Sequence, residues 1–356
     1  MIEKPDMLDF SLEEVEQAVQ RLGQPGYRAK QILKWLHKGV SHFDEMTDLP
    51  QAFRQSLNEQ FQIGRIQILE RHHSNTGDAI KYLFLLSDHN IIECVVMRYK
   101  YGNTLCLSTQ VGCRMGCRFC ASTINGLVRN LSAGEMMSQV IEVNRELEEN
   151  GERRIGNLVL MGTGEPLDNY SNTVKFIKMV HYPMGINMSY RNITLSTCGL
   201  APRMIELADE GLPVTLSVSL HAPNDKLRRF IMPAASVYPI IDVIEASRYY
   251  YEKTGRRITF EYILIKDLND RKEHAEELAE LIKGFPSHVN IIPANEVSGL
   301  DFRRSPERTI QRFIRELESR GVVVTRRREL GLDIEGACGQ LRRSRLTGRR
   351  NQRYER

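Results

Sequence analysis

The chain has 356 residues, of which 41% are hydrophobic, and a formal net charge of +4. This length suffices for one large α/β core with a smaller appended domain, and it excludes more than two or three domains. No window approaches the roughly 20 consecutive apolar residues of a membrane-spanning helix, and the N-terminus lacks the charged and then apolar order of a secretory signal. We therefore expect a cytoplasmic protein that does not contact the membrane.

Residues 1–65 are predicted to form a helical accessory domain. Amphipathic segments separated by Gly and Pro lie at residues 11–23, 27–39 and 43–61. Two β-rich runs follow, at residues 81–87 and 90–99. We expect them to form a β-hairpin within a linker at residues 66–100.

Residues 101–333 are predicted to form the core, because short β-branched runs alternate there with amphipathic segments. The runs lie at residues 105–110, 157–162, 193–197, 214–220, 257–265 and 288–293, with a further one at 321–328. Ser132 and Glu135 form a capping box before the first helix. Six βα units are too few for a full eight-fold barrel, so we expect an α/β fold with a partial (βα)6 TIM-like barrel rather than a doubly wound sheet. In either fold, polar groups at the C-terminal ends of the strands form the site.

Residues 334–356 are expected to form a C-terminal loop and a basic tail. From Arg342 to Arg356 there are seven arginines and one acid, Glu355, which gives this segment a net charge of +6. Guanidinium groups bind phosphate well, so the tail is a candidate nucleic-acid-binding segment. The alternative is a solvated tail that aids solubility.

Three of the seven cysteines, Cys113, Cys117 and Cys120, fall within eight residues. An odd and bunched set suits metal ligation in a reducing compartment better than a disulfide framework. The C-x3-C-x2-C run follows the first strand of the core, and three thiolates on one loop can hold three irons of a [4Fe–4S] cluster and leave the fourth open. A zinc site is the alternative, but structural zinc takes four protein ligands, and no partner Cys or His pair is evident.

Other polar residues stand where predicted strands run into loops. Gly164 and Glu165 follow the second strand, where glycine permits close backbone approach and a carboxylate can accept a hydrogen bond from an amino group. The equivalent places after later strands hold Ser196, Ser219, His221 and Asn295. Each one alone is more simply a cap or turn residue. Together they predict a ring of donors and acceptors around one pocket.

With these motifs, the chain closely resembles the RlmN group of the RlmN/Cfr radical S-adenosylmethionine (SAM) RNA methyltransferases. The similarity runs over nearly the full length, through GCRMGCRFCAST, GLVRNL, GTGEPLDN, SLHAPND, FEYILI, HVNIIPAN and DIEGACGQLR. It implies one [4Fe–4S] cluster on Cys113, Cys117 and Cys120. It also implies that SAM, two molecules per turnover, is contacted by Gly164, Glu165, Ser196, Ser219, Leu220, His221 and Asn295.

The resemblance further implies the substrates and partners. These are an adenosine of 23S ribosomal RNA at the peptidyl transferase centre, methylated at C2, an adenosine in transfer RNA, and an electron donor such as flavodoxin or ferredoxin. We expect the protein to be a monomer.

Three catalytic residues are implied as well. Cys338 takes a methyl group from one SAM, and a second SAM supplies a radical that removes hydrogen from that S-methyl group. The resulting methylene radical adds to the adenine carbon, which is too electron-poor to attack a sulfonium methyl itself. Glu93 accepts the C2 proton, and Cys106 releases the product by forming a disulfide with Cys338.

The residues alone leave alternatives open. Without the resemblance, Cys106 is better explained as a buried strand cysteine. Glu93 is equally explained as an edge-strand glutamate facing solvent, although burial would raise its pKa and make it a better base. Cys94 and Cys198 are expected to be packing residues. For the whole chain, Cfr-type methylation at adenosine C8 and a noncatalytic iron–sulfur RNA-binding module remain alternatives; similarity in the N-terminal region and at SLHAPND favours C2.

Overall fold

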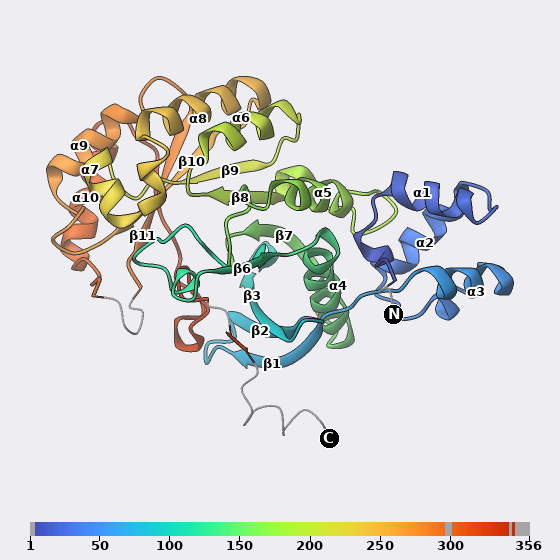
Figure 1. Ribbon diagram of the computed structural model, residues 1–356. Helices are drawn as coiled ribbons and strands as arrows, with labels where there is room; N and C mark the ends of the chain where they lie inside the picture. Colours follow the sequence, from blue (N-terminus) through green and yellow to red (C-terminus); the bar gives the residue numbers. More distant parts are fainter. Residues whose placement is uncertain (1–3, 296–300, 342–343, 346–356) are drawn as a thin grey trace.

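The computed structural model describes residues 4–295, 301–341 and 344–345, the last two by their backbone alone. A single large sheet runs through the described residues, with strand order β1-β2-β3-β4-β7-β8-β9-β10-β11-β12. Helices cover its outer face, and three N-terminal helices lie to one side (Figure 1). Six arginines of the predicted basic tail lie outside the described residues, at positions 342, 343, 349, 350, 353 and 356.

The predicted βα units form the parallel part of the sheet. Its strands are β4 (Gly102–Cys106), β7 (Ile155–Leu160), β8 (Ile193–Thr197), β9 (Thr215–Ser219), β10 (Ile258–Leu264), β11 (Ser287–Pro293) and β12 (Val324–Arg326). The helices between them are α4 (Ala133–Glu149), α5 (Tyr170–Val180), α6 (Ala201–Asp209), α7 (Asp225–Ile231), α8 (Ile240–Thr254), α9 (Lys272–Leu281) and α10 (Glu307–Ser319). The open, partial barrel is confirmed.

Sequence pattern explains these elements. In β8, Ile193 and Leu195 alternate with more exposed residues and are fully buried. The predicted capping box is present: Ser132 accepts from the N–H of Glu135, and the Glu135 carboxylate accepts from the N–H of Ser132.

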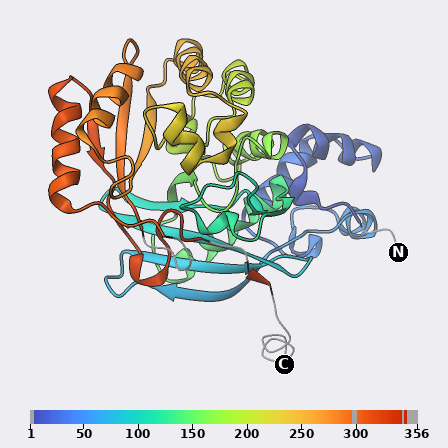
Figure 2. The same cartoon turned by 60° about the vertical axis from the view of Figure 1, so that its left-hand side comes forward.

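An antiparallel extension completes the sheet on the β4 side. β2 (Ala79–Leu85) and β3 (Asn90–Tyr99) form the expected hairpin, and β1 (Gln67–His73) adds an edge strand that its polar sequence did not predict. β3 pairs with β4 through residues 95–99 and with β13 (Ser344–Arg345) through residues 90–91. Figure 2 shows the C-terminal segment, in red, lying against this extension. A second small sheet joins β5 (Gln110–Gly112) to β6 (Leu127–Asn130).

The three N-terminal segments are helical as predicted. They form α1 (Leu12–Arg21), α2 (Tyr27–His37), the 3-10 turn Phe43–Glu45 and α3 (Gln51–Gln60). Neutral His37 joins them to the core, because its Nδ1 accepts the N–H of Ile186 at 3.2 Å. Lys175 and Glu14 add an ion pair at 2.5 Å. No helix in the described residues is both long and apolar enough to span a bilayer.

Candidate active site

The cysteine-rich loop begins directly after β5. Gly112 has a φ of +80°, and a Cβ there would lie 1.9 Å from the carbonyl oxygen of Gly126, so only glycine fits. Farther along, the Arg118 N–H donates to the carbonyl of Ile231, at the end of α7, at 2.9 Å. The protein itself therefore fixes the loop backbone at both places.

Cys113, Cys117 and Cys120 line one cavity of about 140 Å³, which we name the cluster cavity. Burial is the largest cause that raises the pKa of each thiol, so a bound cation is needed to hold all three as thiolates. No three His, Cys, Asp or Glu side chains of the described chain are close enough to share one metal ion. Each thiolate of a [4Fe–4S] cluster binds a different iron, and three cysteines on one loop that line one cavity are a donor set that suits such a cluster.

Gly164 and Glu165, after β7, form one side of the cluster cavity. Gly164 has a φ of +118°, and a Cβ there would lie 2.7 Å from Thr109 Oγ1. The buried Glu165 carboxylate accepts from the N–H groups of Leu167 at 3.0 Å and Cys198 at 2.7 Å. Burial raises the pKa of Glu165, and these two donors oppose the rise. The cavity thus has a closely packed side with a fixed carboxylate.

Ser196, Ser219 and His221 lie at the ends of the next strands and line the same cavity. His221 has a φ of +59°, and its Nδ1 accepts the N–H of Ile263 at 3.1 Å. Burial, followed by the charge of Arg228, lowers the pKa of His221 to about 3. The imidazole is therefore neutral, with its proton on Nε2.

Leu220 and Asn295 lie apart from the other predicted SAM contacts. Leu220 does not line the cluster cavity: its side chain is completely buried in the hydrophobic core, and its N–H donates to the Glu261 carbonyl at 3.1 Å. Asn295 lines a second, adjoining cavity, where its Nδ2 donates to the Cys338 carbonyl at 3.0 Å. Its Oδ1 is buried and has no hydrogen-bond partner among the described residues, so it can accept from a ligand.

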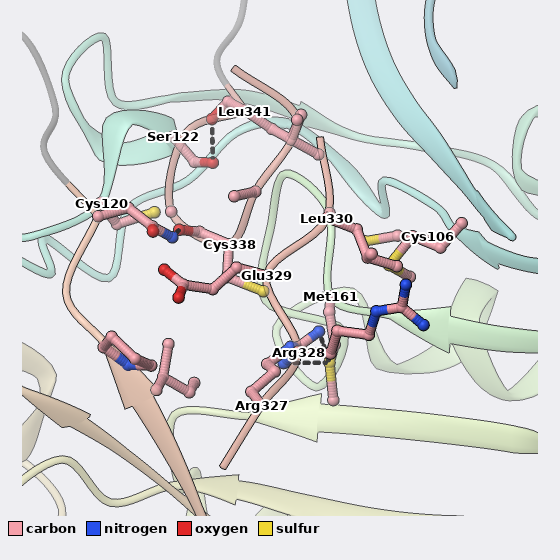
Figure 3. Close-up of a pocket in the computed structure, with 18 residues that line it drawn as sticks. Cys106, Cys120, Ser122, Met161, Arg327, Arg328, Glu329, Leu330, Cys338 and Leu341 are labelled. Carbon is pink, nitrogen blue, oxygen red and sulfur yellow. Dashed lines mark hydrogen bonds between the residues drawn. The ribbon is translucent and has the colours of Figure 1, made fainter. Parts of the chain in front are cut away.

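Cys106 and Cys338 both line this second cavity, which we name the thiol cavity (Figure 3). Cys106 is the last residue of β4, and Cys338 lies on the C-terminal loop; both are free thiols. The Ser122 hydroxyl donates to the Leu341 carbonyl at 2.6 Å, and the Ala121 N–H donates to the carbonyl of the residue after Cys338 at 2.7 Å. These bonds hold the C-terminal loop against the segment that follows the cluster loop.

The two cavities adjoin. Residues that line both are Cys120, Ser122, Met161, Gly162, Ile292, Arg327, Cys338 and Gly339. The thiol of the C-terminal loop therefore lies where the two spaces meet.

Glu93 lies on β3, which is an interior strand between β2 and β4. Its side chain is only 5% exposed, so the solvent-facing alternative does not hold. Val95 pairs with Cys106 across the two strands, and Glu93, two residues earlier, lies on the same face of the sheet. The buried carboxylate thus shares the face that presents Cys106.

Comparisons with known proteins agree with this geometry. The model of the radical SAM superfamily matches residues 107–282, and that of the ribosomal RNA large subunit methyltransferase N-terminal domain matches residues 5–63. The chain is 50% identical over 338 residues to a probable dual-specificity RNA methyltransferase RlmN of Clostridium tetani, covering 95% of this chain and 96% of that protein. Its identity to the protein of the same description in Alkaliphilus oremlandii is 51% over 345 residues, covering 97% and 99%.

The chain belongs to the RlmN family. A crystal structure of a radical SAM methyltransferase from Sphaerobacter thermophilus matches it with a TM-score of 0.90 and 43% identity, covering 95% of this chain and 99% of that one. This RlmN-family chain is thus a radical SAM RNA methyltransferase. Membership implies SAM and a [4Fe–4S] cluster, which the three-thiol loop and the polar strand ends of the cluster cavity fit.

Two charged residues of this RlmN-family site were not predicted from the sequence. Glu261 is a buried carboxylate on β10 that accepts from Ser217 Oγ at 2.8 Å and Asn290 Nδ2 at 3.0 Å. Arg327 follows β12 and lines both cavities. For Glu261 the sequence offered a signal, because this glutamate lies inside the apolar run FEYILI, where burying an unpaired charge is costly.

Cys94 and Cys198, the two cysteines expected to be packing residues, differ in what they contact. Cys94 lies on the opposite face of β3 from Glu93 and is fully buried in the hydrophobic core. Cys198 is also buried in the core, but it lines the cluster cavity as well. Its N–H donates to Glu165, and its carbonyl accepts from Arg228 at 2.6 Å. Cys198 therefore helps to shape the cavity as well as to pack.

Proposed function

We propose that this enzyme methylates C2 of an adenosine in the peptidyl transferase centre of 23S ribosomal RNA, and of an adenosine in transfer RNA, through a methyl group carried on Cys338. One observation supports this most strongly. Cys338 and Cys106 line one cavity, and Cys338 also lines the cavity of the three cluster cysteines. A radical methyltransferase that stored its methyl group on the protein would need this arrangement.

We assign the cluster to Cys113, Cys117 and Cys120, and SAM to the cluster cavity. There Gly164 leaves room for close approach, and Glu165 offers a fixed carboxylate to an amino group. Further SAM contacts are proposed at Ser196, Ser219, Leu220, His221 and Asn295. Neutral His221 can donate only through Nε2, which orients any acceptor on the ligand.

Cys338 first acts as a nucleophile. Its thiolate attacks the methyl carbon of one SAM, so that an S–CH3 bond forms as the methyl–sulfonium bond breaks and S-adenosylhomocysteine leaves. When bound, the cluster and a second SAM supply a 5′-deoxyadenosyl radical that removes one hydrogen atom from this methyl group. The methylene radical left on Cys338 forms a carbon–carbon bond to adenine C2 and joins the protein to the RNA.

Release of the product is assigned to Glu93 and Cys106. The adduct would pass one electron to the bound cluster and lose the C2 proton, for which buried Glu93, on the face that presents Cys106, is the proposed acceptor. The Cys106 thiolate then attacks the Cys338 sulfur, so that a disulfide forms while the sulfur–carbon bond breaks and the freed carbon takes a proton. A dithiol reductant restores both thiols.

The helical region, residues 1–65, and the basic C-terminal segment, residues 334–356, are proposed to grip the RNA. The core at residues 101–333 would perform the chemistry, with residues 66–100 connecting it to the helices. A one-electron donor such as flavodoxin or ferredoxin and a cytoplasmic monomer complete the proposal.

The test is mass spectrometry of RNA after anaerobic incubation with enzyme, reductant and methyl-labelled SAM, with the methyl position mapped on the base. We expect label at C2 of one adenosine per RNA and, before RNA is added, on the Cys338 peptide. Label at C8 would replace the proposal by the Cfr-type reaction. Label on RNA with an unlabelled Cys338 would assign the carrier role to another residue.

A further inference from the structure

Arg327 is placed between the two cavities. It follows β12, its side chain is 18% exposed, and it lines both the cluster cavity and the thiol cavity. Its N–H donates to the Ile291 carbonyl at 2.9 Å, which continues the pairing of β12 with β11. The sheet therefore fixes the backbone from which the guanidinium extends.

The guanidinium is directed by two weak partners. Both of its terminal nitrogens lie 3.5 Å from the sulfur of Met161, and one lies 3.8 Å from the Glu261 carboxylate (Figure 3 shows the Met161 contact). A thioether is a poor acceptor, and the carboxylate is beyond hydrogen-bonding distance. Glu261 itself is held by Ser217 and Asn290. Glu261 thus orients Arg327 without forming a close ion pair that would neutralise it.

We propose that Arg327 is a positioning residue that supplies positive charge to Cys338 and Cys106, and that Glu261 tunes this charge. The inference rests on the proposed function, in which both thiols act as nucleophiles. A thiolate is the reactive form in each step: Cys338 when it takes the methyl group, and Cys106 when it attacks the Cys338 sulfur. A cation that lines the same cavity as both thiols favours the thiolate at two steps of one cycle.

The charges around the two thiols agree with this role. Burial raises the pKa of Cys338; Arg327 lowers it, and Glu261 raises it. Burial, followed by the neighbouring Cys338, raises the pKa of Cys106 to about 12, and Arg327 again opposes the rise. The other titratable and charged groups that face this set are Tyr99, Cys120, Arg328 and Glu329, together with Glu93 and Cys94 on β3. Arg327 acts on both thiols.

The experiment measures the reactivity of the Cys338 thiol rather than methylation. Protein is made in iron-depleted medium, its cluster is rebuilt anaerobically without SAM, and Cys338 is alkylated with iodoacetamide between pH 7 and 10. Peptide mass spectrometry gives the rate at each pH. In Arg327→Met the profile should move to higher pH, and a displacement by one pH unit would make alkylation at pH 8 about tenfold slower. Arg327→Lys should retain most of the wild-type rate.

Glu261→Gln provides the deciding second variant, because it keeps the size and polarity of the side chain and removes one negative charge. It should move the profile to lower pH, opposite to Arg327→Met. Arg320→Met is the matched control: this arginine is exposed, pairs with Glu276 at 2.6 Å and Glu316 at 3.0 Å, lines neither cavity, and should leave the profile unchanged.

Displacements in the same direction for the Arg327 and Glu261 variants, or no displacement in either, would overturn the inference. If Arg327→Met loses its cluster or its fold, the Glu261→Gln profile decides alone. The proposed function fails by a different result, in which SAM leaves the Cys338 of wild-type enzyme unmethylated while the alkylation profiles still differ.

Discussion

The cluster cavity and the thiol cavity are built in opposite ways. The three cluster cysteines fall within eight residues on one loop, whereas Cys106 and Cys338 stand 232 positions apart and meet only because the chain folds back. The first arrangement is a local chelate that short-range geometry can produce. The second depends on the sheet, which places β4, and on the C-terminal loop, which side-chain and backbone hydrogen bonds hold in place.

Because of this difference, the cluster loop and the two thiols should respond differently to substitution. A change in the local chelate should remove the cluster and everything that depends on it. A change at one thiol should stop the cycle at one step and leave the earlier steps intact. Variants of the two kinds therefore separate these responses.

The largest effect is expected from Cys113→Ala. With one of three ligands missing, the loop should not hold a stable cluster, so brown colour, SAM cleavage and RNA methylation should all be lost. Cys338→Ala is the matched comparison, which should keep the cluster and SAM cleavage while losing methylation. Iron content and the yield of 5′-deoxyadenosine measure both. A Cys113→Ala protein with a full cluster and normal cleavage would remove this loop from the radical chemistry.

Cys106→Ala should stop the cycle later. Cluster assembly, SAM cleavage and addition to adenine should proceed, but without a second thiol the bond from Cys338 to the RNA should persist. The expected result is a denaturant-resistant protein–RNA band that disappears after nuclease treatment. The double variant Cys106→Ala, Cys338→Ala should form no such band. Normal multiple turnover by Cys106→Ala would show that the two thiols are not linked in this way.

The same contrast explains what the sequence predicted. The cluster loop, the capping box at Ser132 and the order of βα units depend on short-range pattern, and the structure reproduces the capping box and the βα order. Glu93 could not be placed, because only the pairing of β3 with β4 on one side and β2 on the other makes it interior. The distant partners Glu261 and Arg327 likewise meet through the sheet, and no local pattern joins them.

Strand β1 and the small β5–β6 sheet were missed for a related reason. Residues in β1 are polar and half exposed, so they lack the alternation that predicts a strand. β5 has only three residues, and its pairing with β6 is made across the cluster loop. In both cases tertiary pairing, rather than local preference, decides the structure.

A smaller effect is expected from Gly164→Ala on the cluster cavity. The added Cβ would meet Thr109 Oγ1 at 2.7 Å at a φ of +118°, so the backbone must shift, at a cost of about 1–3 kcal/mol. SAM affinity, measured by equilibrium dialysis under anaerobic conditions, should fall about tenfold. Gly151→Ala is the control, since its φ of +71° is also positive but a Cβ there meets nothing within 4 Å. Equal SAM affinity in both variants would argue that Gly164 does not shape the ligand site.

The smallest effect concerns acid stability through His221. Its pKa is about 3 in the folded protein, because burial opposes the charge, and about 6.5 in the unfolded chain. The unfolded chain therefore binds the extra proton first, and the free energy of unfolding should fall as pH drops below 6.5. Between pH 7 and 5 this one residue accounts for about 2 kcal/mol of the free energy of unfolding.

His221→Gln keeps an acceptor for the Ile263 N–H but cannot be protonated. The free energy of unfolding of the cluster-loaded variant, measured with urea, should therefore fall by about that much less than the wild type over the same interval. Exposed His73→Gln is the control and should follow the wild type. If His221→Gln follows the wild type as well, the imidazole is protonated in the folded cavity. It could not then hold the Ile263 N–H on Nδ1, and the neutral orientation proposed for SAM contact would have to be abandoned.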